Sequence, residues 1–130
     1  MTSPAVTVHV TEEFSAVHEK FLIKGIRHLP VVDGQGRIQG LVTETDFNRV
    51  TMPRMTEDGP VYDKTALDRT LLRRVMTPEP CTLCPDDPLS KAVSLMAEHK
   101  YGCIPIVDVQ GKVIGIVTEI DILKYIRKML

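Results

Sequence analysis

Hydrophobic and polar positions follow two kinds of pattern along this chain. Short apolar runs predict pairs of strands at residues 29–33 and 37–42, and again at 104–108 and 112–117. Each pair is joined by a short segment that contains glycine, as is typical of a β-hairpin. An amphipathic helix is expected ahead of each hairpin, because apolar residues recur there at helical spacing. They are Phe14, Val17, Phe21 and Leu22 before the first hairpin, and Leu89, Ala92, Val93, Met96 and Ala97 before the second.

The segments around these elements are also informative. Short extended segments are expected at Thr7-Val8 and Thr82-Leu83, ahead of the two helices. After each hairpin a further helix is expected, short after Asp46 and longer after Asp121. Residues 51–62 predict a loop, because they combine proline, glycine and charged residues. A helix leading into the second half is predicted by Leu67, Leu71, Leu72 and Val75.

The two halves are copies of one unit. Pro30-Val31-Val32-Asp33 reappears as Pro105-Ile106-Val107-Asp108, and this offset of 75 residues holds without a gap through both halves. We therefore expect a first repeat at 1–50, a connection at 51–75 and a second repeat at 76–130, each with the order β-α-β-β-α. A sheet with helices on one face leaves its other face uncovered. The predicted fold is thus α/β (α+β), with the repeats packed sheet to sheet about a pseudo-twofold axis.

Composition narrows the range of partners. The 130 residues include 16 Lys and Arg against 17 Asp and Glu, so the formal net charge is -1. This balance provides no excess positive charge to attract nucleic acid or an anionic membrane surface. The sequence has no apolar run of about eighteen residues and no secretory signal. With three cysteines, an odd number, these features predict a cytoplasmic protein with free thiols.

The motif with the clearest chemistry is Gly-x-x-Thr-x-x-Asp, at residues 40–46 and 115–121. It lies where a strand leads into a helix, and free backbone N–H groups and the helix dipole favour an anion there. An aspartate at such a place can accept hydrogen bonds from a ribose diol. A ligand-binding interpretation thus selects Thr43, Asp46, Thr118 and Asp121. The same spacing also fits a capping box, in which both side chains only satisfy backbone donors. The spacing alone leaves both interpretations open.

These motifs resemble those of the CBS domain, a family named after cystathionine β-synthase. The resemblance rests on Met76-Thr77-Pro78, on residues 102–108 and 115–121, and on the matching residues 25–33 and 40–46 of the first repeat. It covers both repeats and therefore indicates a tandem CBS pair, or Bateman module. The resemblance implies a regulatory module that is not an enzyme and requires no cofactor. It also implies that AMP, ADP, ATP or S-adenosylmethionine binds between the repeats, and that the chain forms a homodimer.

The resemblance further implies roles for particular residues. Ribose and phosphate would be held by Thr43, Asp46, Thr118 and Asp121, and adenine would lie among Thr7, Val8, Ile26, Pro30, Thr82, Leu83, Tyr101 and Pro105. Arg27 and His28 are candidates for a phosphate contact, because guanidinium binds phosphate well. Arg27 could serve either cleft or be a solvated surface charge. Glu44 and Glu119 argue against an uncompensated triphosphate, which a carboxylate repels unless a metal ion intervenes.

Two alternative functions are retained beside nucleotide sensing. One is a structural dimerisation module that binds no ligand and in which Thr and Asp only cap helices. The other is thiol redox or metal regulation through Cys81 and Cys84, which form a C-x-x-C sequence. That pair lies in an extended segment, where side chains three residues apart point to opposite faces. We therefore expect structural cysteines and no metal site. No combination of nucleophile, base and orienting partner predicts catalysis.

Overall fold

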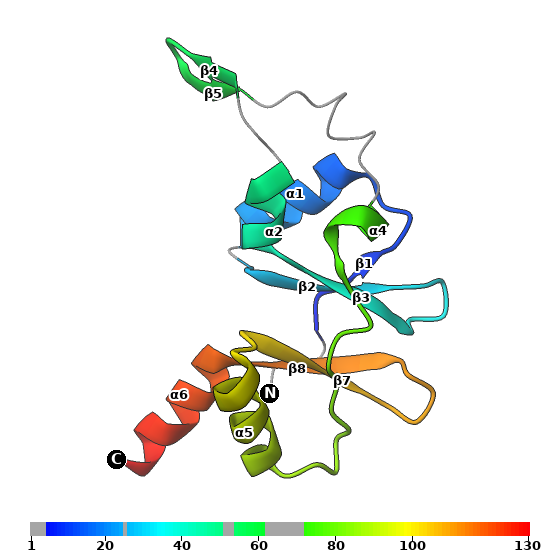
Figure 1. The fold of residues 1–130 in the computed structure, drawn as a ribbon, viewed down its shortest axis with the longest axis vertical. Coiled ribbons are helices and arrows are strands. Elements are labelled where there is room, and N and C mark those ends of the chain that lie inside the picture. Colours follow the sequence, from blue (N-terminus) through cyan, green and yellow to red (C-terminus); the bar gives the residue numbers. More distant parts are fainter. Residues whose placement is uncertain (1–4, 25, 51–53, 62–71) are drawn as a thin grey trace.

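The structure is a computed structural model that describes residues 5–24, 26–50, 54–61 and 72–130. Its mixture of helices and strands confirms the α/β class (Figure 1). The helices are α1 (Phe14–Lys24), α2 (Glu44–Val50), α4 (Leu72–Val75), α5 (Leu89–His99) and α6 (Glu119–Met129). The strands are β1 (Val8–His9), β2 (His28–Val32), β3 (Ile38–Thr43), β4 (Arg54–Thr56), β5 (Gly59–Val61), β6 (Thr77–Pro78), β7 (Cys103–Val107) and β8 (Val113–Thr118).

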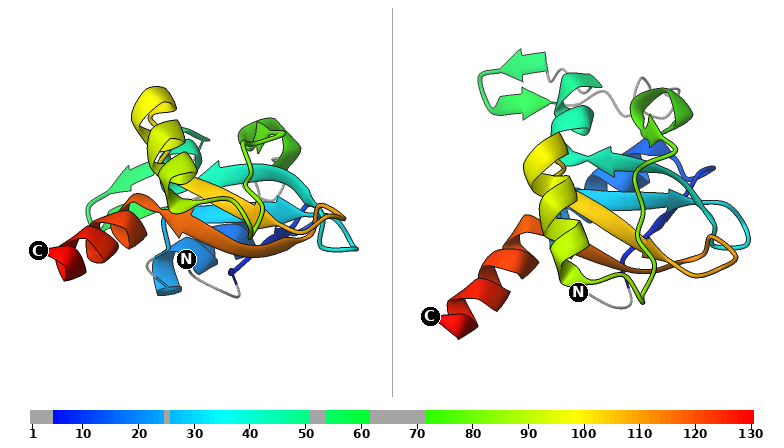
Figure 2. Two further views of the ribbon diagram at one scale, coloured as in Figure 1. Left: turned by 90° about the horizontal axis from the view of Figure 1, so that it is seen from below. Right: turned by 60° about the horizontal axis from the view of Figure 1, so that its bottom comes forward.

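Two antiparallel hairpins face each other at the centre of the molecule, and the helices lie outside them (Figures 1 and 2). Strands β2 and β3 have α1 and α2 on their outer side, whereas β7 and β8 have α5 and α6. His28 lies opposite Thr43 in the first hairpin, and Cys103 lies opposite Thr118 in the second. These pairs are related by the 75-residue offset, so both repeats have one register. The predicted sheet-to-sheet arrangement is confirmed.

The turns of the two hairpins meet at the pseudo-twofold axis. Two backbone hydrogen bonds join the two turn regions, from Ile38 N–H to the Gly111 carbonyl (2.9 Å) and from Val113 N–H to the Gly36 carbonyl (3.0 Å). Each bond is the image of the other under the repeat offset. Arg37 and Lys112 form the antiparallel bridge between them. Because the exchange is reciprocal, both repeats present the same surface to each other, as in a twofold dimer interface.

The connection between the repeats packs on the first repeat before it enters the second. Leu72 of α4 is buried in the core of the first repeat, and β6 pairs antiparallel with β3. The sheet order is therefore β1-β2-β3-β6, one strand more than the three that the repeat unit predicts. Gly40 makes this close approach feasible. A Cβ atom at that position would lie 2.8 Å from Cγ of Met76 and 3.0 Å from the Thr77 carbonyl oxygen.

Part of the loop predicted at 51–62 is a hairpin, and the prediction is wrong for residues 54–61. Strands β4 and β5 pair antiparallel, with Thr56 opposite Gly59. Glu57-Asp58 forms the turn, and Gly59, the first residue of β5, has φ +109°, a conformation that glycine adopts without strain. The Thr56 hydroxyl donates to the Gly59 carbonyl at 2.6 Å. Residues 51–53 and 62–71, which include the predicted helix positions Leu67 and Leu71, lie outside the described residues.

The helices predicted within the two repeats form, but some of their apolar positions are exposed. Phe14, Val17 and Phe21 of α1 are buried, whereas Leu22 is 69% exposed because it is one residue, and therefore about 100° of helix rotation, away from Phe21. In α5 only Ala92 is buried. Leu89 and Val93 are exposed, so the predicted stripe of α5 is only partly covered. The predicted strand at Thr82-Leu83 is reduced to one parallel bridge from Leu83 to Ile106.

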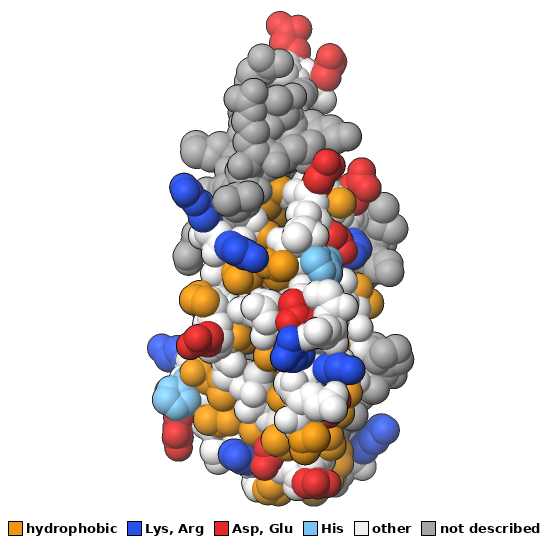
Figure 3. Space-filling view, turned by 90° about the vertical axis from the view of Figure 1, so that its right-hand side faces the viewer, with side chains coloured by type: hydrophobic (Ala, Val, Ile, Leu, Met, Phe, Trp, Pro, Cys, Tyr) orange, Lys and Arg blue, Asp and Glu red, His pale blue; other side chains and the backbone are white. Residues whose placement is uncertain are grey.

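The surface agrees with the balanced charge of the sequence. Acidic and basic side chains are interspersed on the face that Figure 3 shows, over the side of the molecule where the hairpin turns lie. Within the described part of the chain, no helix is long and apolar enough to cross a membrane.

Candidate ligand pocket between the repeats

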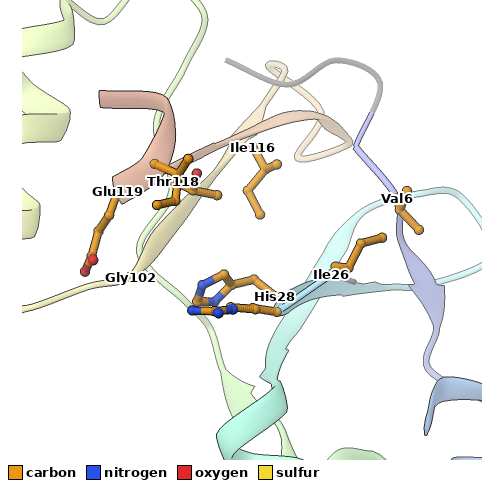
Figure 4. A pocket seen from close by; sticks show the side chains of 9 residues that line it. Val6, Ile26, His28, Gly102, Ile116, Thr118 and Glu119 are labelled. Carbon is orange, nitrogen blue, oxygen red and sulfur yellow. The ribbon is translucent and has the colours of Figure 1, made fainter. Parts of the chain in front are cut away.

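A pocket of about 510 Å³ lies between the two repeats (Figure 4). Its lining residues are Val6, Ile26, Arg27 and His28 from the first repeat, and Gly102, Ile116, Thr118, Glu119 and Ile120 from the second. Val6, Ile26 and Ile116 lie toward one end, while Gly102 and Glu119 lie toward the other. This volume and the combination of an apolar wall with a few polar groups are typical of small-molecule sites.

Both Thr-x-x-Asp motifs form capping boxes. At the start of α6, Asp121 N–H donates to Thr118 Oγ1 (3.3 Å), and Thr118 N–H donates to Asp121 Oδ2 (2.9 Å). At the start of α2, the equivalent bonds between Thr43 and Asp46 measure 3.1 Å and 3.2 Å. The capping interpretation is therefore confirmed. In each aspartate Oδ1 accepts no hydrogen bond from the described residues, so capping leaves one carboxylate oxygen of each available to a ligand.

Each capped junction is tied to the loop that precedes the hairpin of its own repeat. Glu44 N–H donates to the Arg27 carbonyl (2.9 Å), and Glu119 N–H donates to the Gly102 carbonyl (3.2 Å). Arg27 and Gly102 are equivalent under the offset, and both line the same pocket. The pocket therefore lies where the two repeats meet and combines the capped junction of the second repeat with the loop of the first. The sequence alone did not determine that Arg27 lines this pocket.

His28 is the half-buried histidine of this pocket. Its Nδ1 is buried and has no hydrogen-bond partner among the described residues. Burial is the largest influence on the pKa of His28 and lowers it from its ordinary value near 6.5. Glu119 and Asp46 raise the pKa and Arg27 lowers it, so that the pKa remains lowered overall. The ring lies where a side chain at position 102 would be, since a Cβ on Gly102 would lie 2.9 Å from His28 Cε1. His28 is therefore neutral near pH 7.

Arg27 and Glu119, the charged side chains that line the pocket, have no ion-pair partner in the described part of the chain. The ion pairs there are Lys20–Glu12, Arg37–Asp33 and Lys91–Asp87. Arg27 and Glu119 are both exposed. Their charges therefore remain available to a ligand in the pocket.

The predicted site residues are only partly brought together in this pocket. Ile26, Arg27, His28 and Thr118 line it, and Asp121 is bonded to Thr118. Val8, Leu83, Pro30 and Pro105 are buried, and Tyr101 stacks on His99 at 5.3 Å between ring centroids. Those five, with Thr7, Thr82, Thr43 and Asp46, are not among the lining residues of this pocket, and their ligand roles stay predictions.

Four lining residues had not been singled out as site residues from the sequence. They are Val6, Gly102, Ile116 and Ile120. Gly102 is equivalent to the candidate Arg27 under the 75-residue offset, which was the signal available for it. Ile116 precedes Thr118 by two positions on β8, and residues two apart on a strand face the same side. That alternation was the signal available for Ile116. Val6 and Ile120 line the pocket because of the way the two repeats pack against each other, and no local sequence pattern indicates that packing.

The cysteines occupy three different environments. Cys103 is buried, and burial raises the pKa of its thiol to about 12. Cys81 is half-buried and Cys84 is exposed. A thiol with so high a pKa carries almost no reactive thiolate. The described residues contain no group of three His, Cys, Asp or Glu side chains arranged to hold a metal ion.

Comparison with known proteins identifies the family. A model of the CBS domain matches residues 1–52 and 72–128, so this chain belongs to the CBS domain family. A CBS domain-containing protein of Dictyostelium discoideum is 28% identical over 134 residues, which cover 100% of this chain and 90% of that protein. Homoserine O-acetyltransferase of Methanococcoides burtonii is 27% identical over 122 residues, 94% of this chain but only 22% of the enzyme. The chain therefore spans about a fifth of that enzyme.

Solved structures share the whole fold. The CBS domain pair of protein MJ0100, in complex with 5′-methylthioadenosine and S-adenosyl-L-methionine, matches with a TM-score of 0.81 at 23% identity, over 100% of this chain and 94% of that one. CBSX2 of Arabidopsis thaliana, in complex with AMP, matches with a TM-score of 0.80 at 24% identity, over 99% and 93% of the two chains. The fold is that of a tandem CBS pair.

Proposed function

We propose that this chain is a regulatory module that binds an adenosine-containing ligand in the pocket between its repeats. The observation that carries the proposal is the pocket itself. It joins an apolar wall from both repeats to a capped helix start and to two charges, Arg27 and Glu119, that have no ion-pair partner among the described residues. The similar pairs MJ0100 and CBSX2 have adenosine compounds bound. A ligand that contacts both repeats can bias their relative packing, provided that it binds one arrangement better than another.

In this proposal the ends of the ligand meet different surfaces. The adenine base packs among Val6, Ile26 and Ile116, which supply apolar contact area. The ribose hydroxyls donate to the free Oδ1 of Asp121, while the cap keeps that carboxylate in position. A phosphate lies near Arg27, whose guanidinium is free to form two parallel hydrogen bonds. Glu119 disfavours a triphosphate, so AMP, S-adenosylmethionine and related compounds fit better than ATP without a metal ion.

Thermal unfolding with added ligands tests this function. Wild type is melted with AMP, ADP, ATP with and without magnesium, 5′-methylthioadenosine and S-adenosylmethionine. A ligand at 100 times its Kd adds about 2.7 kcal/mol, which raises Tm by about 10 °C for a chain of this size. We expect Asp121→Ala to abolish the increase and Asp46→Ala, a matched control that loses the equivalent cap, to retain it. An unchanged Tm with every adenosine compound contradicts the proposal and leaves the structural alternative.

We also propose that the second repeat forms the interface of a homodimer. Helix α6 has no buried residue, yet it carries apolar side chains that are 42–71% exposed: Ile120, Leu123, Tyr125, Ile126 and Met129. Exposed apolar faces of this kind mark interaction surfaces. A twofold dimer covers such a face with the same face of a second copy. The structural alternative, a dimerisation module without a ligand, is favoured by this same face.

Sedimentation velocity tests the dimer. We expect wild type to sediment as a dimer and Leu123→Glu as a folded monomer, because a charge on this face would have to be desolvated in the interface. Lys124→Glu is the matched control on the adjacent face of the same helix and should remain dimeric. A monomeric wild type, or a dimeric Leu123→Glu variant, contradicts this interface.

A further inference from the structure

The polar end of the pocket contains a histidine in an unusual position. His28 Cε1 and Nε2 and Glu119 Oε1 all lie within 4 Å of one point above Gly102, the place that a Cβ atom of residue 102 would occupy. Figure 4 shows His28 and Glu119 projecting from the two repeats on either side of Gly102. A side chain at position 102 would fill this space. Glycine therefore leaves the imidazole edge and the carboxylate facing one small volume of the pocket.

The surroundings of His28 keep it neutral without a ligand. Its Nδ1 is buried and unpartnered among the described residues, and a charged imidazolium would have to bury an unpaired N–H there. Three charged groups act on the ring: Glu119 from α6, Asp46 from α2, and Arg27, which precedes His28 in the chain. Their effects on the pKa oppose one another, and burial is the largest contribution, so the pKa is lowered. The ring is thus poised to take up a proton when negative charge is added nearby.

The charge of the pocket depends on that proton. With neutral His28, the charges of Arg27, Glu119 and Asp121 leave the proposed site with a net negative charge, which suits an uncharged adenosine compound better than a phosphate. Protonation of His28 cancels this negative charge and therefore favours a phosphate. Since a phosphate raises the pKa of a neighbouring histidine, linkage requires that protonation of the histidine strengthen phosphate binding equally.

We propose that His28 determines the charge selectivity of the pocket, so that phosphate-bearing adenosine ligands bind with uptake of a proton on His28 and uncharged ones bind without it. This inference rests on the proposed function, because it needs an adenosine ligand in this pocket. The contribution of His28 to AMP binding consequently grows as the pH falls toward the pKa of the ring, whereas its contribution to 5′-methylthioadenosine binding does not.

Proton NMR and calorimetry test the proposal on the full chain. The imidazole Hε1 signals are followed against pH with and without AMP. The signal that disappears in His28→Gln identifies His28 among the four histidines. We expect AMP to raise the pKa of His28 by about one unit and 5′-methylthioadenosine to leave it unchanged. The AMP affinity of wild type, divided by that of His28→Gln, should then rise several-fold from pH 8 to pH 5.5, up to about tenfold per unit of pKa. The phosphate of AMP ionises with a pKa near 6. Because this ionisation affects both proteins equally, it cancels in the ratio.

Two further variants separate this role from a structural one. Glu119→Gln removes a carboxylate that raises the pKa of His28, so it should lower that pKa further while leaving the ring in place. His99→Gln alters an exposed histidine outside the pocket. The AMP affinity of this variant should change with pH in the same way as that of wild type. If AMP binds wild type but neither the pKa of His28 nor the affinity ratio responds, this inference is overturned and the proposed function stands. If no adenosine compound binds at any pH, both are overturned.

Discussion

The two repeats share one backbone register but differ in how completely they bury their apolar residues. In the first repeat, the rings of Phe14 and Phe47 stack with centroids 3.9 Å apart, and both are buried. The equivalent positions of the second repeat are Leu89, which is 39% exposed, and Ile122, which is half-buried. The pairing within the central hairpin is thus the same in both repeats, whereas the packing outside the hairpin differs. Pairing depends on backbone hydrogen bonds, and packing depends on side-chain volume and on what covers it.

The covering segment explains part of this difference. Helix α4 packs against α2, and its Leu72 is buried in the core of the first repeat. Helix α6, the equivalent of α2, has no buried residue. The first repeat therefore uses the connecting segment of its own chain to cover its apolar residues. The second repeat retains an apolar face, which is why we place the dimer interface there.

Truncating equivalent core residues should produce the largest effect. Phe14→Ala removes a fully buried ring and should lower the free energy of unfolding by about 3–5 kcal/mol. Leu89→Ala, at the equivalent position, should lower it by only about 1 kcal/mol in the monomer, since much of Leu89 is already in water. Urea unfolding of both variants in the Leu123→Glu background measures the difference. Equal losses would show that the two cores are equivalent in energy.

Adding a methyl group at Gly40 should have the next largest effect. Gly40→Ala forces Met76 and β6 away from β3, and we expect it to cost about 1–3 kcal/mol of unfolding free energy. Gly34→Ala is the control, because its Cβ would only touch His9 Nε2 at 3.8 Å. Thermal unfolding compares the two variants. A Gly40→Ala protein as stable as the control would mean that β6 is not held against β3 in solution.

Removing a helix cap should cost less. Thr118→Ala leaves the Asp121 N–H without its side-chain acceptor, and the expected loss is about 1 kcal/mol. Thr118→Ser keeps the hydroxyl and should be close to wild type. Far-UV circular dichroism through a urea titration reads both helicity and stability. If Ser were as damaging as Ala, the methyl group of Thr118 and not its cap would be responsible.

The smallest effect is a pH dependence that His28 adds to the first repeat. His28 occupies the position of Cys103 in the second repeat, and the pKa of His28 is lowered in the folded protein. The unfolded chain therefore binds more protons than the folded one as the pH falls through 6.5, so stability decreases toward acid. Tm measured from pH 7.5 to 5 should fall less in His28→Gln than in wild type. Parallel curves for the two proteins would exclude His28 as a source of this dependence.

Local patterns predicted much of the fold because their causes are local. The Thr-x-x-Asp spacing indicated both caps as one of its two interpretations, since those bonds join residues three apart in sequence. The apolar runs correctly predicted β2, β3, β7 and β8. The β4–β5 hairpin was missed because its strands are only three residues long, too short to show an apolar alternation. Val6 and Ile120 were missed as pocket residues because they meet only across the two repeats.

By itself, the sequence determined the repeat, its β-α-β-β-α order and the resemblance to the family, and it offered the capped junctions as one of two interpretations. Each of these follows from residues close in sequence or from the constant offset between the copies. Only the tertiary structure decided that β6 joins the first sheet, that Leu22 and Leu89 are exposed, and that Arg27 and His28 line the pocket with Thr118. These outcomes depend on which surfaces meet when two similar units pack together, and periodicity within one unit carries no information about that contact.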